Sequence, residues 1–172
     1  MRYLLLTTLF LSACGRESSP TVPPGEITTE MAGYIDVFTE LAREHGVTVS
    51  QQLYSAEILD SKDWQEFLKE KSQRKTLVGL CDVIINPPKK RSFPGYKKEP
   101  IQIFRYVTVK RMHHRPFQKA LIFHELGHCL LNMAHSQSGI MSEVMKLVKD
   151  EADLSEMMDE FFQSYKTKEG IM

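Results

Sequence analysis

The chain has 172 residues, and its 22 Lys and Arg residues balance its 22 Asp and Glu residues, so its formal net charge at pH 7 is +0. This length suits one domain with its own hydrophobic core. Because positive charge is not in excess, nothing in the composition suggests a nucleic-acid partner. We expect a monomer.

The N-terminus has the features of an exported, lipid-anchored protein. Met1-Arg2-Tyr3 is a short basic start, and residues 4–11 form an apolar run that is too short to span a bilayer. Leu11-Ser12-Ala13-Cys14 then resembles the bacterial lipobox. The pattern predicts a signal peptide over residues 1–13, cleavage before Cys14 and a lipid on the Cys14 sulfur. The alternative is an ordinary secretory signal with a chance cysteine.

The residues after Cys14 bear on the location of the protein. Gly15 follows the cysteine, and by resemblance to bacterial lipoproteins its presence in place of Asp favours the outer membrane. Residues 14–26 are rich in Ser and Pro and are expected to form a tether. The folded domain would then span residues 27–172 and face either the periplasm or the outside of the cell.

The first half of this domain predicts a helix, a strand and a charged segment. Residues 28–45 are expected to form a helix that ends before Gly46. Its shared apolar face consists of Met31, Ile35, Phe38 and Ala42. Residues 47–59 contain β-branched residues in rough alternation, which predicts a strand. Residues 62–75 are charged and could form a short helix or a loop.

Two further strands are predicted in the middle part of the chain. Residues 76–85 are rich in β-formers and are followed by Asn86-Pro87-Pro88, which stops a strand. Residues 87–100 are basic and contain Pro and Gly, as expected for a hairpin or loop. Residues 101–109 are the next strand.

An amphipathic helix follows, and it contains the candidate metal-binding and catalytic residues. Pro116 suits a first helical turn, and Asn132 tolerates the left-handed conformation that ends a helix. The apolar stripe consists of Leu121, Ile122, Leu126, Cys129, Leu130 and Met133. His113 and His114 precede the helix; they could be extra metal ligands, but exposed loop histidines are the better interpretation.

The sequence His124-Glu125-Leu126-Gly127-His128 is an H-E-x-x-H motif. Residues four apart share a helix face, so His124 and His128 can direct ring nitrogens at one metal ion. Glu125 is turned by about 100° and can stand beside the metal. Catalytic zinc usually has three protein ligands and an open position. His135, seven residues after His128, is the expected third ligand.

The end of the chain predicts another amphipathic helix. Residues 142–150 are expected to be irregular with a helical portion, and Asp153-Leu154-Ser155-Glu156 has the form of a capping box. The helical stripe that follows consists of Leu154, Met157, Met158, Phe161, Phe162 and Tyr165. We expect this stripe to belong to the core.

The run from His124 to His135, followed by Ser138-Gly139-Ile140-Met141-Ser142, resembles the metzincin clan of zinc metallopeptidases. Their motif is H-E-x-x-H-x-x-G-x-x-H, followed by a turn with a methionine under the metal. Met141 is six residues after His135, as in the short matrixin-like members. The glycine and third histidine of the motif would fall on Leu131 and Ala134, so the turn after the helix must differ.

The stretch from residue 76 to residue 142 also resembles a group of small bacterial metallopeptidases, many of them lipoproteins, with a strand similar to Gly79-Leu80-Cys81. These resemblances imply a single α+β domain of the zincin or metzincin type. Its twisted mixed sheet would pack on the active-site helix and on a C-terminal helix. They also imply that a peptide substrate lies along one of the two strands before the active-site helix, and that Met141 forms a floor to the site.

Cys81 and Cys129 remain as a pair once Cys14 is set aside. In an oxidising periplasm they could form a disulfide between strand and helix, or remain two buried thiols. Cys129 points away from the face of His128 and is not expected to bind the metal.

The resulting expectation is a zinc-dependent peptidase that acts on peptides or proteins. His124, His128 and His135 would bind Zn²⁺, and Glu125 would be the general base toward a zinc-activated water. A glutamate could replace His135 as third ligand, with Glu143 and Glu151 as candidates. The alternative function is a membrane-anchored metal-binding or scaffold lipoprotein with little or no peptidase activity.

Overall fold

A computed structural model describes residues 25–71, 77–86, 101–136, 138–143, 145 and 148–171. The predicted signal peptide, Cys14 and the loop of residues 87–100 lie outside the described residues. The described residues form one α+β domain of four helices and a three-stranded mixed sheet. No helix among them is long and apolar enough to cross a membrane.

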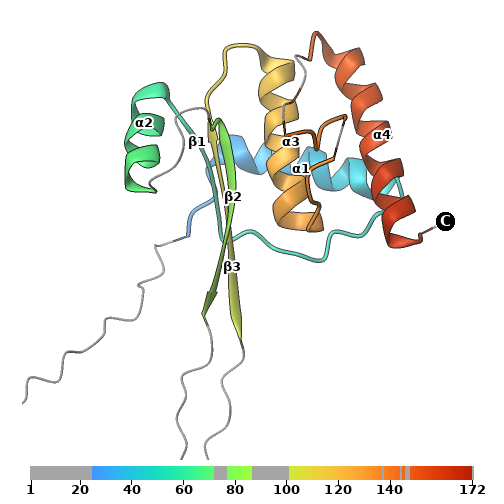
Figure 1. Cartoon of the computed structure of the whole chain (residues 1–172), viewed down its shortest axis with the longest axis horizontal. Coiled ribbons are helices and arrows are strands. Elements are labelled where there is room, and N and C mark those ends of the chain that lie inside the picture. Colours follow the sequence, from blue (N-terminus) through green and yellow to red (C-terminus); the bar gives the residue numbers. More distant parts are fainter. Residues whose placement is uncertain are drawn as a thin grey trace, which may run out of the picture.

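The elements follow one another in the order helix, strand, helix, two strands and two helices (Figure 1). Their bounds are α1 Thr29–Glu44, β1 Ser55–Leu59, α2 Ser61–Glu70, β2 Gly79–Asn86, β3 Gln102–Lys110, α3 Arg115–Leu131 and α4 Glu151–Glu169. The helix predicted over residues 28–45 is α1 with its two caps. The charged segment, left open between helix and loop, forms the helix α2.

The sheet has the order β1-β3-β2, so the last strand in the sequence lies in the middle. β1 runs parallel to β3, with Ser55 opposite Tyr106, and β2 runs antiparallel to it, with Cys81 opposite Val107. The strand predicted over residues 47–59 was wrong in its first half, because pairing with β3 begins at Ser55. Val47 and Val49 pack on the core from a connection that belongs to none of the described strands.

Helices cover the sheet unequally. α1 and α3 contact it from one side and α2 contacts it from the other, while α4 lies outside α3 (Figure 1). The core between α1, α3 and α4 is aromatic: the ring of Phe38 lies 5.4 Å from that of Phe123 and 5.8 Å from that of Phe162. The sheet therefore packs on the predicted active-site helix and on α1, while the C-terminal helix packs on these two helices.

The start of α4 differs from the prediction by three residues. Asp150, and not Asp153, is the N-cap, and its carboxylate accepts a hydrogen bond of 2.9 Å from the backbone N–H of Asp153. The Asp153 carboxylate in turn accepts from the N–H of Lys149 at 2.9 Å. Two overlapping capping signals are present in this sequence, and the chain uses the earlier one.

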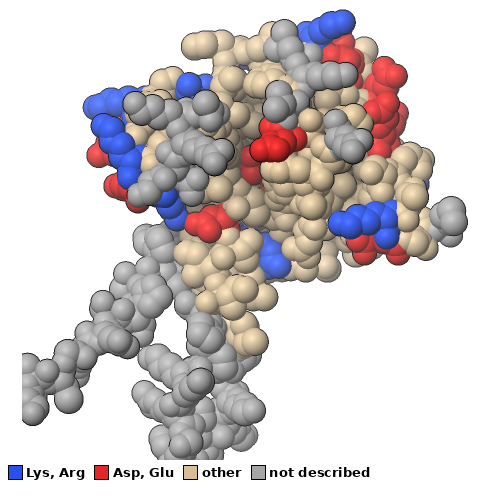
Figure 2. Space-filling view, viewed as in Figure 1, with Lys and Arg blue, Asp and Glu red and all other residues tan. Residues whose placement is uncertain are grey.

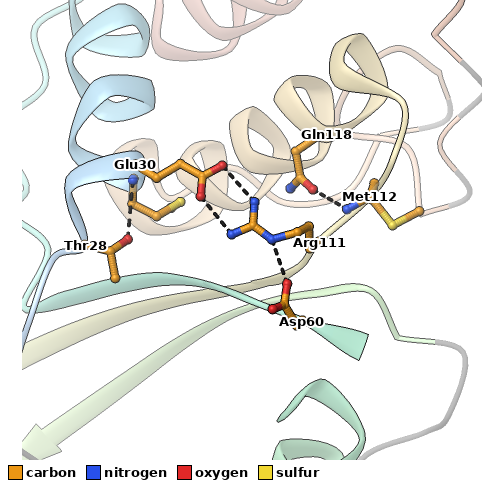
Figure 3. Close-up of polar contacts among 7 residues, drawn as sticks. Thr28, Glu30, Asp60, Arg111, Met112 and Gln118 are labelled. Carbon is orange, nitrogen blue, oxygen red and sulfur yellow. Dashed lines mark hydrogen bonds and ion pairs between the residues drawn. The ribbon is translucent and has the colours of Figure 1, made fainter. Parts of the chain in front are cut away.

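An ion-pair cluster joins three segments of the chain just after the end of β3 (Figure 3). Arg111, just after β3, donates to both carboxylate oxygens of Glu30 at 3.0 and 2.8 Å and to Asp60 at 2.8 Å. Glu30 belongs to the first turn of α1, and Asp60 is the N-cap of α2. The chain therefore enters α3 from a fixed position relative to α1 and α2.

Candidate metal centre

The helix α3 holds the H-E-x-x-H motif in its last two turns. The His114 side chain caps its start by accepting from the N–H of Phe117, and Pro116 lies in its first turn. Asn132 ends it with φ 51°, in the left-handed conformation that the sequence predicted. The reversal at Asn132 turns the chain back along the helix, which brings residues 133–142 beside the motif.

The rings of His124 and His128 are oriented by backbone carbonyl groups. The Nδ1 atom of His124 lies 2.6 Å from the carbonyl oxygen of Ile140, and that of His128 lies 2.6 Å from the carbonyl oxygen of Met133. A carbonyl oxygen can only accept a hydrogen bond, so both Nδ1 atoms must carry a hydrogen. In the neutral rings both Nε2 atoms are therefore bare lone-pair donors.

These two bare nitrogens face each other. The Nε2 atoms of His124 and His128 are 3.1 Å apart. Two lone pairs at this distance repel each other unless a cation lies between them. Two imidazole nitrogens bound at roughly 2.0–2.1 Å to a tetrahedral zinc lie about 3.3 Å apart. The pair thus fits a metal ion of this kind without rearrangement.

His135 completes the group. Ligand atoms of His124, His128 and His135 all lie within 4.8 Å of one another, and these three residues could hold a metal ion. The ring of His135 is 4.7 Å from that of His128 and is exposed, while His124 is buried. The three predicted ligands are therefore brought together from the helix and from the segment beyond its reversal.

The two glutamates considered as alternative ligands are outside this group. Glu151 forms an ion pair of 3.2 Å with Lys119. Glu143 is exposed and lines the same cavity as the histidines, but it does not belong to the cluster of possible ligands among the described residues. The geometry therefore favours His135 as the third ligand.

Glu125 is buried between the helix and β2. The Glu125 carboxylate lies so close to the backbone of Gly79 that a Cβ atom added at Gly79 would overlap the carboxylate. Burial raises the pKa of Glu125 to about 7, although a hydrogen bond with the backbone of Cys81 acts in the opposite direction. A carboxyl with this pKa can both accept and release a proton near neutral pH.

The pKa values of His124 and His128 are lowered, which is the direction that favours metal binding. Burial lowers the pKa of His124 to about 4, against the effect of its bond to Ile140, and the neighbouring His128 and His135 lower it further. The pKa of His128 is also lowered, mainly by burial. Both rings are thus neutral at pH 7, and neutral imidazole is the form that binds metal.

The group opens into a cavity of about 830 Å³. One wall is β2 together with the two residues before it, which contribute residues 77–81 and Val83, and the other includes Asn132 and Met145. Of the two strands considered as the border of the cleft, β2 takes this place, because β3 is in the middle of the sheet. β2 is an edge strand among the described strands, so one side of its backbone faces the cavity without a neighbouring strand.

Met141 and the cysteines support the helix from two sides. Met141 is buried against α3 at Gly127, where an added Cβ would lie 2.8 Å from the Met141 sulfur. Cys81 of β2 and Cys129 of α3 form a disulfide, so neither is a metal ligand. Of the two states left open for this pair, the structure has the bonded one.

Two contributions to the site were not predicted from the sequence. The carbonyl groups of Met133 and Ile140 fix the histidine tautomers. Every residue has a carbonyl group, so the sequence does not indicate which ones bind the rings. Gly79 was noted only as part of a family-like strand, and its contact with Glu125 was missed. The signal for it was a glycine in the middle of a run of β-formers, which often marks a close approach of another group.

Comparisons of the chain with known protein families, with curated proteins and with solved structures found no match.

Proposed function

We propose that the protein is a zinc-dependent peptidase, most simply an endopeptidase, with His124, His128 and His135 as metal ligands and Glu125 as general base. The observation that carries the proposal is the pair of bare Nε2 atoms 3.1 Å apart, each fixed by a carbonyl bond at Nδ1. Two bare nitrogens at this distance repel each other unless a proton or a metal cation lies between them, and burial lowers the pKa of both rings, which favours the metal.

The donor set supports zinc in particular. Three imidazoles without a thiolate suit zinc among the common metals, and carboxylate-rich sites would suit calcium or magnesium. A structural zinc site usually has four protein ligands, whereas three leave a position open for a reactant. The exposure of His135 and the open cavity beside it agree with access from solvent.

In the proposed reaction, the metal, Glu125 and the surrounding backbone groups would each have a separate role. Zinc, when bound, would supply Lewis-acid chemistry toward water and a carbonyl oxygen. Glu125 would accept a proton on its carboxylate from the attacking water and pass it to the leaving amine. Gly79 allows the carboxylate to stand at the wall of the cavity, and the carbonyls of Ile140 and Met133 keep the imidazoles in one tautomer.

A peptide substrate is supported by the strand at the cavity. The outer edge of β2 can pair with an extended chain by main-chain hydrogen bonds, which recognises a peptide without regard to its sequence. The resemblance of residues 124–141 to metzincins points the same way. We also propose that a lipid on Cys14 anchors the enzyme to a bacterial outer membrane, on the evidence of the sequence at residues 1–15.

The test compares residues 15–172 with three variants, each measured for zinc content and for cleavage of a diverse peptide mixture. Glu125→Gln should keep zinc and lose cleavage by roughly 100-fold or more, because a general base typically contributes that much. His135→Ala should lose zinc affinity. Glu151→Gln, the matched control, should change neither quantity, since its partner is Lys119.

Two results would overturn the proposal. Full cleavage by Glu125→Gln would remove the assigned base. A wild-type protein that holds zinc but cleaves no peptide in the mixture would favour the metal-binding lipoprotein instead.

A further inference from the structure

An apolar surface lies at one end of the sheet, outside the candidate metal centre. Beyond the end of α3, the strands β2 and β3 continue as a two-stranded ribbon that projects from the body of the domain (Figure 1). The ribbon face consists of Val83, Ile85, Ile101 and Ile103, whose exposed fractions are 42%, 58%, 61% and 47%. Large aliphatic side chains exposed together in this way usually mark a contact surface.

The four side chains lie on one face of the ribbon. Ile85 is directly opposite Ile103. Val83 is two residues before Ile85 on β2, and Ile101 is two residues before Ile103, just before β3 begins. Side chains two apart on a strand point to the same side. Cys81 shares this face and is bonded to α3, so the exposed ribbon face continues the sheet face that α3 covers. Arg105, opposite Val83 on this face, is buried. Residues 83–86 and 101–104 contain no charged residue, and the projecting end is free of blue and red atoms in Figure 2.

The sequence that joins the two strands is basic. Residues 87–100 contain five of the 22 Lys and Arg residues of the chain, one of its 22 Asp and Glu residues, and the aromatic residues Phe93 and Tyr96. Positive charge next to exposed aliphatic side chains complements a surface with anionic headgroups over an apolar interior. A protein partner would not by itself require both features.

The described chain begins at the same end of the molecule. Gly25 lies against Tyr54, and the ring of Tyr54 is 4.8 Å from that of Phe104, which follows Ile103 on β3 and points to the opposite face. In Figure 1 the first described residues, in blue, lie beside the sheet where the ribbon begins to project. Cys14 precedes Gly25 by eleven residues, which span at most roughly 40 Å when extended. A lipid on Cys14 would thus bring the ribbon face within reach of the membrane.

We propose that the ribbon face of Val83, Ile85, Ile101 and Ile103 docks on the surface of an anionic lipid bilayer. This contact would fix the orientation of the domain, because a lipid on Cys14 and a tether leave the domain free to rotate. It uses none of the metal ligands, so the result of the peptidase test does not decide it.

The test uses residues 15–172, which lack the lipid but keep every described helix and strand. Co-sedimentation is measured with vesicles of phosphatidylcholine, with and without phosphatidylglycerol. Wild type should bind the anionic vesicles and be released by salt. The double variant Ile85→Ser/Ile103→Ser should bind them roughly tenfold more weakly. Val37→Ser/Ile171→Ser, with exposed fractions of 41% and 44% before substitution, should bind like wild type.

Zinc content and thermal unfolding show that each variant is folded. Three outcomes would overturn the proposal. Wild type could fail to bind anionic vesicles, or the ribbon variant could bind them as well as wild type does. Wild type could also be a dimer that Ile85→Ser/Ile103→Ser dissociates, without effect on vesicles, which would show that a second copy covers the face.

Discussion

Two backbone carbonyls decide which nitrogen of each histidine faces the cavity. Ile140 and Met133 each accept a hydrogen bond from an Nδ1 atom, so both Nε2 atoms point at the place that the proposed metal would take. Metal-binding histidines commonly have such a partner, which fixes the ring and raises its affinity. In this chain both partners come from the segment after the helix, so the fold of residues 133–141 is part of the site.

The buried Glu125 carboxyl predicts a pH-dependent stability of the metal-free protein. Its pKa is about 7 in the folded state against an ordinary value of 4.5, so the folded protein holds a proton that the unfolded chain loses between these values. The protonated Glu125 carboxyl therefore contributes to the free energy of unfolding fully below pH 4.5, and this contribution is lost as the pH rises from 4.5 through about 7. Glu125→Gln should therefore gain about 3 kcal/mol in free energy of unfolding relative to wild type between pH 4 and pH 8.

Urea unfolding of both metal-free proteins across this range checks the prediction. Other titrating groups are common to the two proteins and cancel in the difference. A difference that does not change with pH would show that the carboxyl is not buried in the manner described.

The contact of Gly79 with Glu125 predicts that a substitution at Gly79 displaces the general base but leaves the metal ligands in place. A methyl group at this position would overlap the Glu125 carboxylate, which would have to move. We expect Gly79→Ala to keep its zinc and to lose peptide cleavage by roughly tenfold to 100-fold, because a displaced base transfers protons poorly. Zinc content and kcat/KM are the measurements.

Gly33→Ala is the matched control for this variant. Gly33 lies on an exposed face of α1, and nothing stands within 4 Å of an added Cβ. Alanine should leave cleavage unchanged there and slightly stabilise the helix. Unchanged cleavage in Gly79→Ala would mean that the position of the carboxylate is not important.

At the scale of elements, the Cys81–Cys129 bond joins the strand at the cavity to the helix of the ligands. The two cysteines are 48 residues apart, and closing a loop of this length stabilises a fold by about 4 kcal/mol. Reduction of the metal-free protein should lower its free energy of unfolding by an amount of this order. In residues 15–172 these are the two remaining cysteines, so a reductant acts at one bond.

The same experiment on the Cys81→Ala/Cys129→Ala variant supplies the control. The reductant should then have no effect on urea unfolding. If wild type were equally stable before and after reduction, the bond would not constrain the fold.

The sequence predicted those elements whose signal is local. α1, α3 and α4 were predicted from their periodic apolar faces, and the end of α3 at Asn132 followed from the tolerance of Asn for the left-handed conformation. The charged segment that forms α2 was left open between helix and loop. His124 and His128 followed from their spacing, while the preference for His135 over a glutamate rested on the metzincin-like position of Met141. Each of these features depends on residues within a few positions of one another.

Features that depend on distant neighbours were harder to predict. Val47 and Val49 look like strand residues, but whether a strand lies beside them is decided by β3, more than 50 residues later. The start of α4 was misplaced because Asp150 and Asp153 are both suitable caps. The contact of Gly79 with Glu125 depends on how β2 lies against α3, which no local pattern reveals.

At the scale of the whole molecule, Arg111 joins three parts of the chain. It donates to Glu30 of α1 and to Asp60 at the start of α2, and these bonds hold the pKa of its guanidinium above its ordinary value. The Arg111 and Glu30 side chains are 45% exposed, so solvent weakens the pairs. Arg111→Met should lower the free energy of unfolding by roughly 1 kcal/mol.

Arg43→Met provides the comparison for this network. Arg43 pairs with Glu40 within the same exposed helix turn, so its loss should leave the urea midpoint of unfolding unchanged. Equal effects of the two substitutions would show that the Arg111 cluster does not hold the segments together.

The place of β3 in the sheet has a consequence for the time at which the chain can fold. β1 and β2 are made first, but neither pairs with the other, and both require the strand that follows them. A growing chain that has not yet reached Gln102 can therefore form none of the described sheet. Late pairing of this kind is slow, because the ends of long loops must meet. If the chain is exported as proposed, this order would delay formation of the sheet until residues beyond Gln102 have been made.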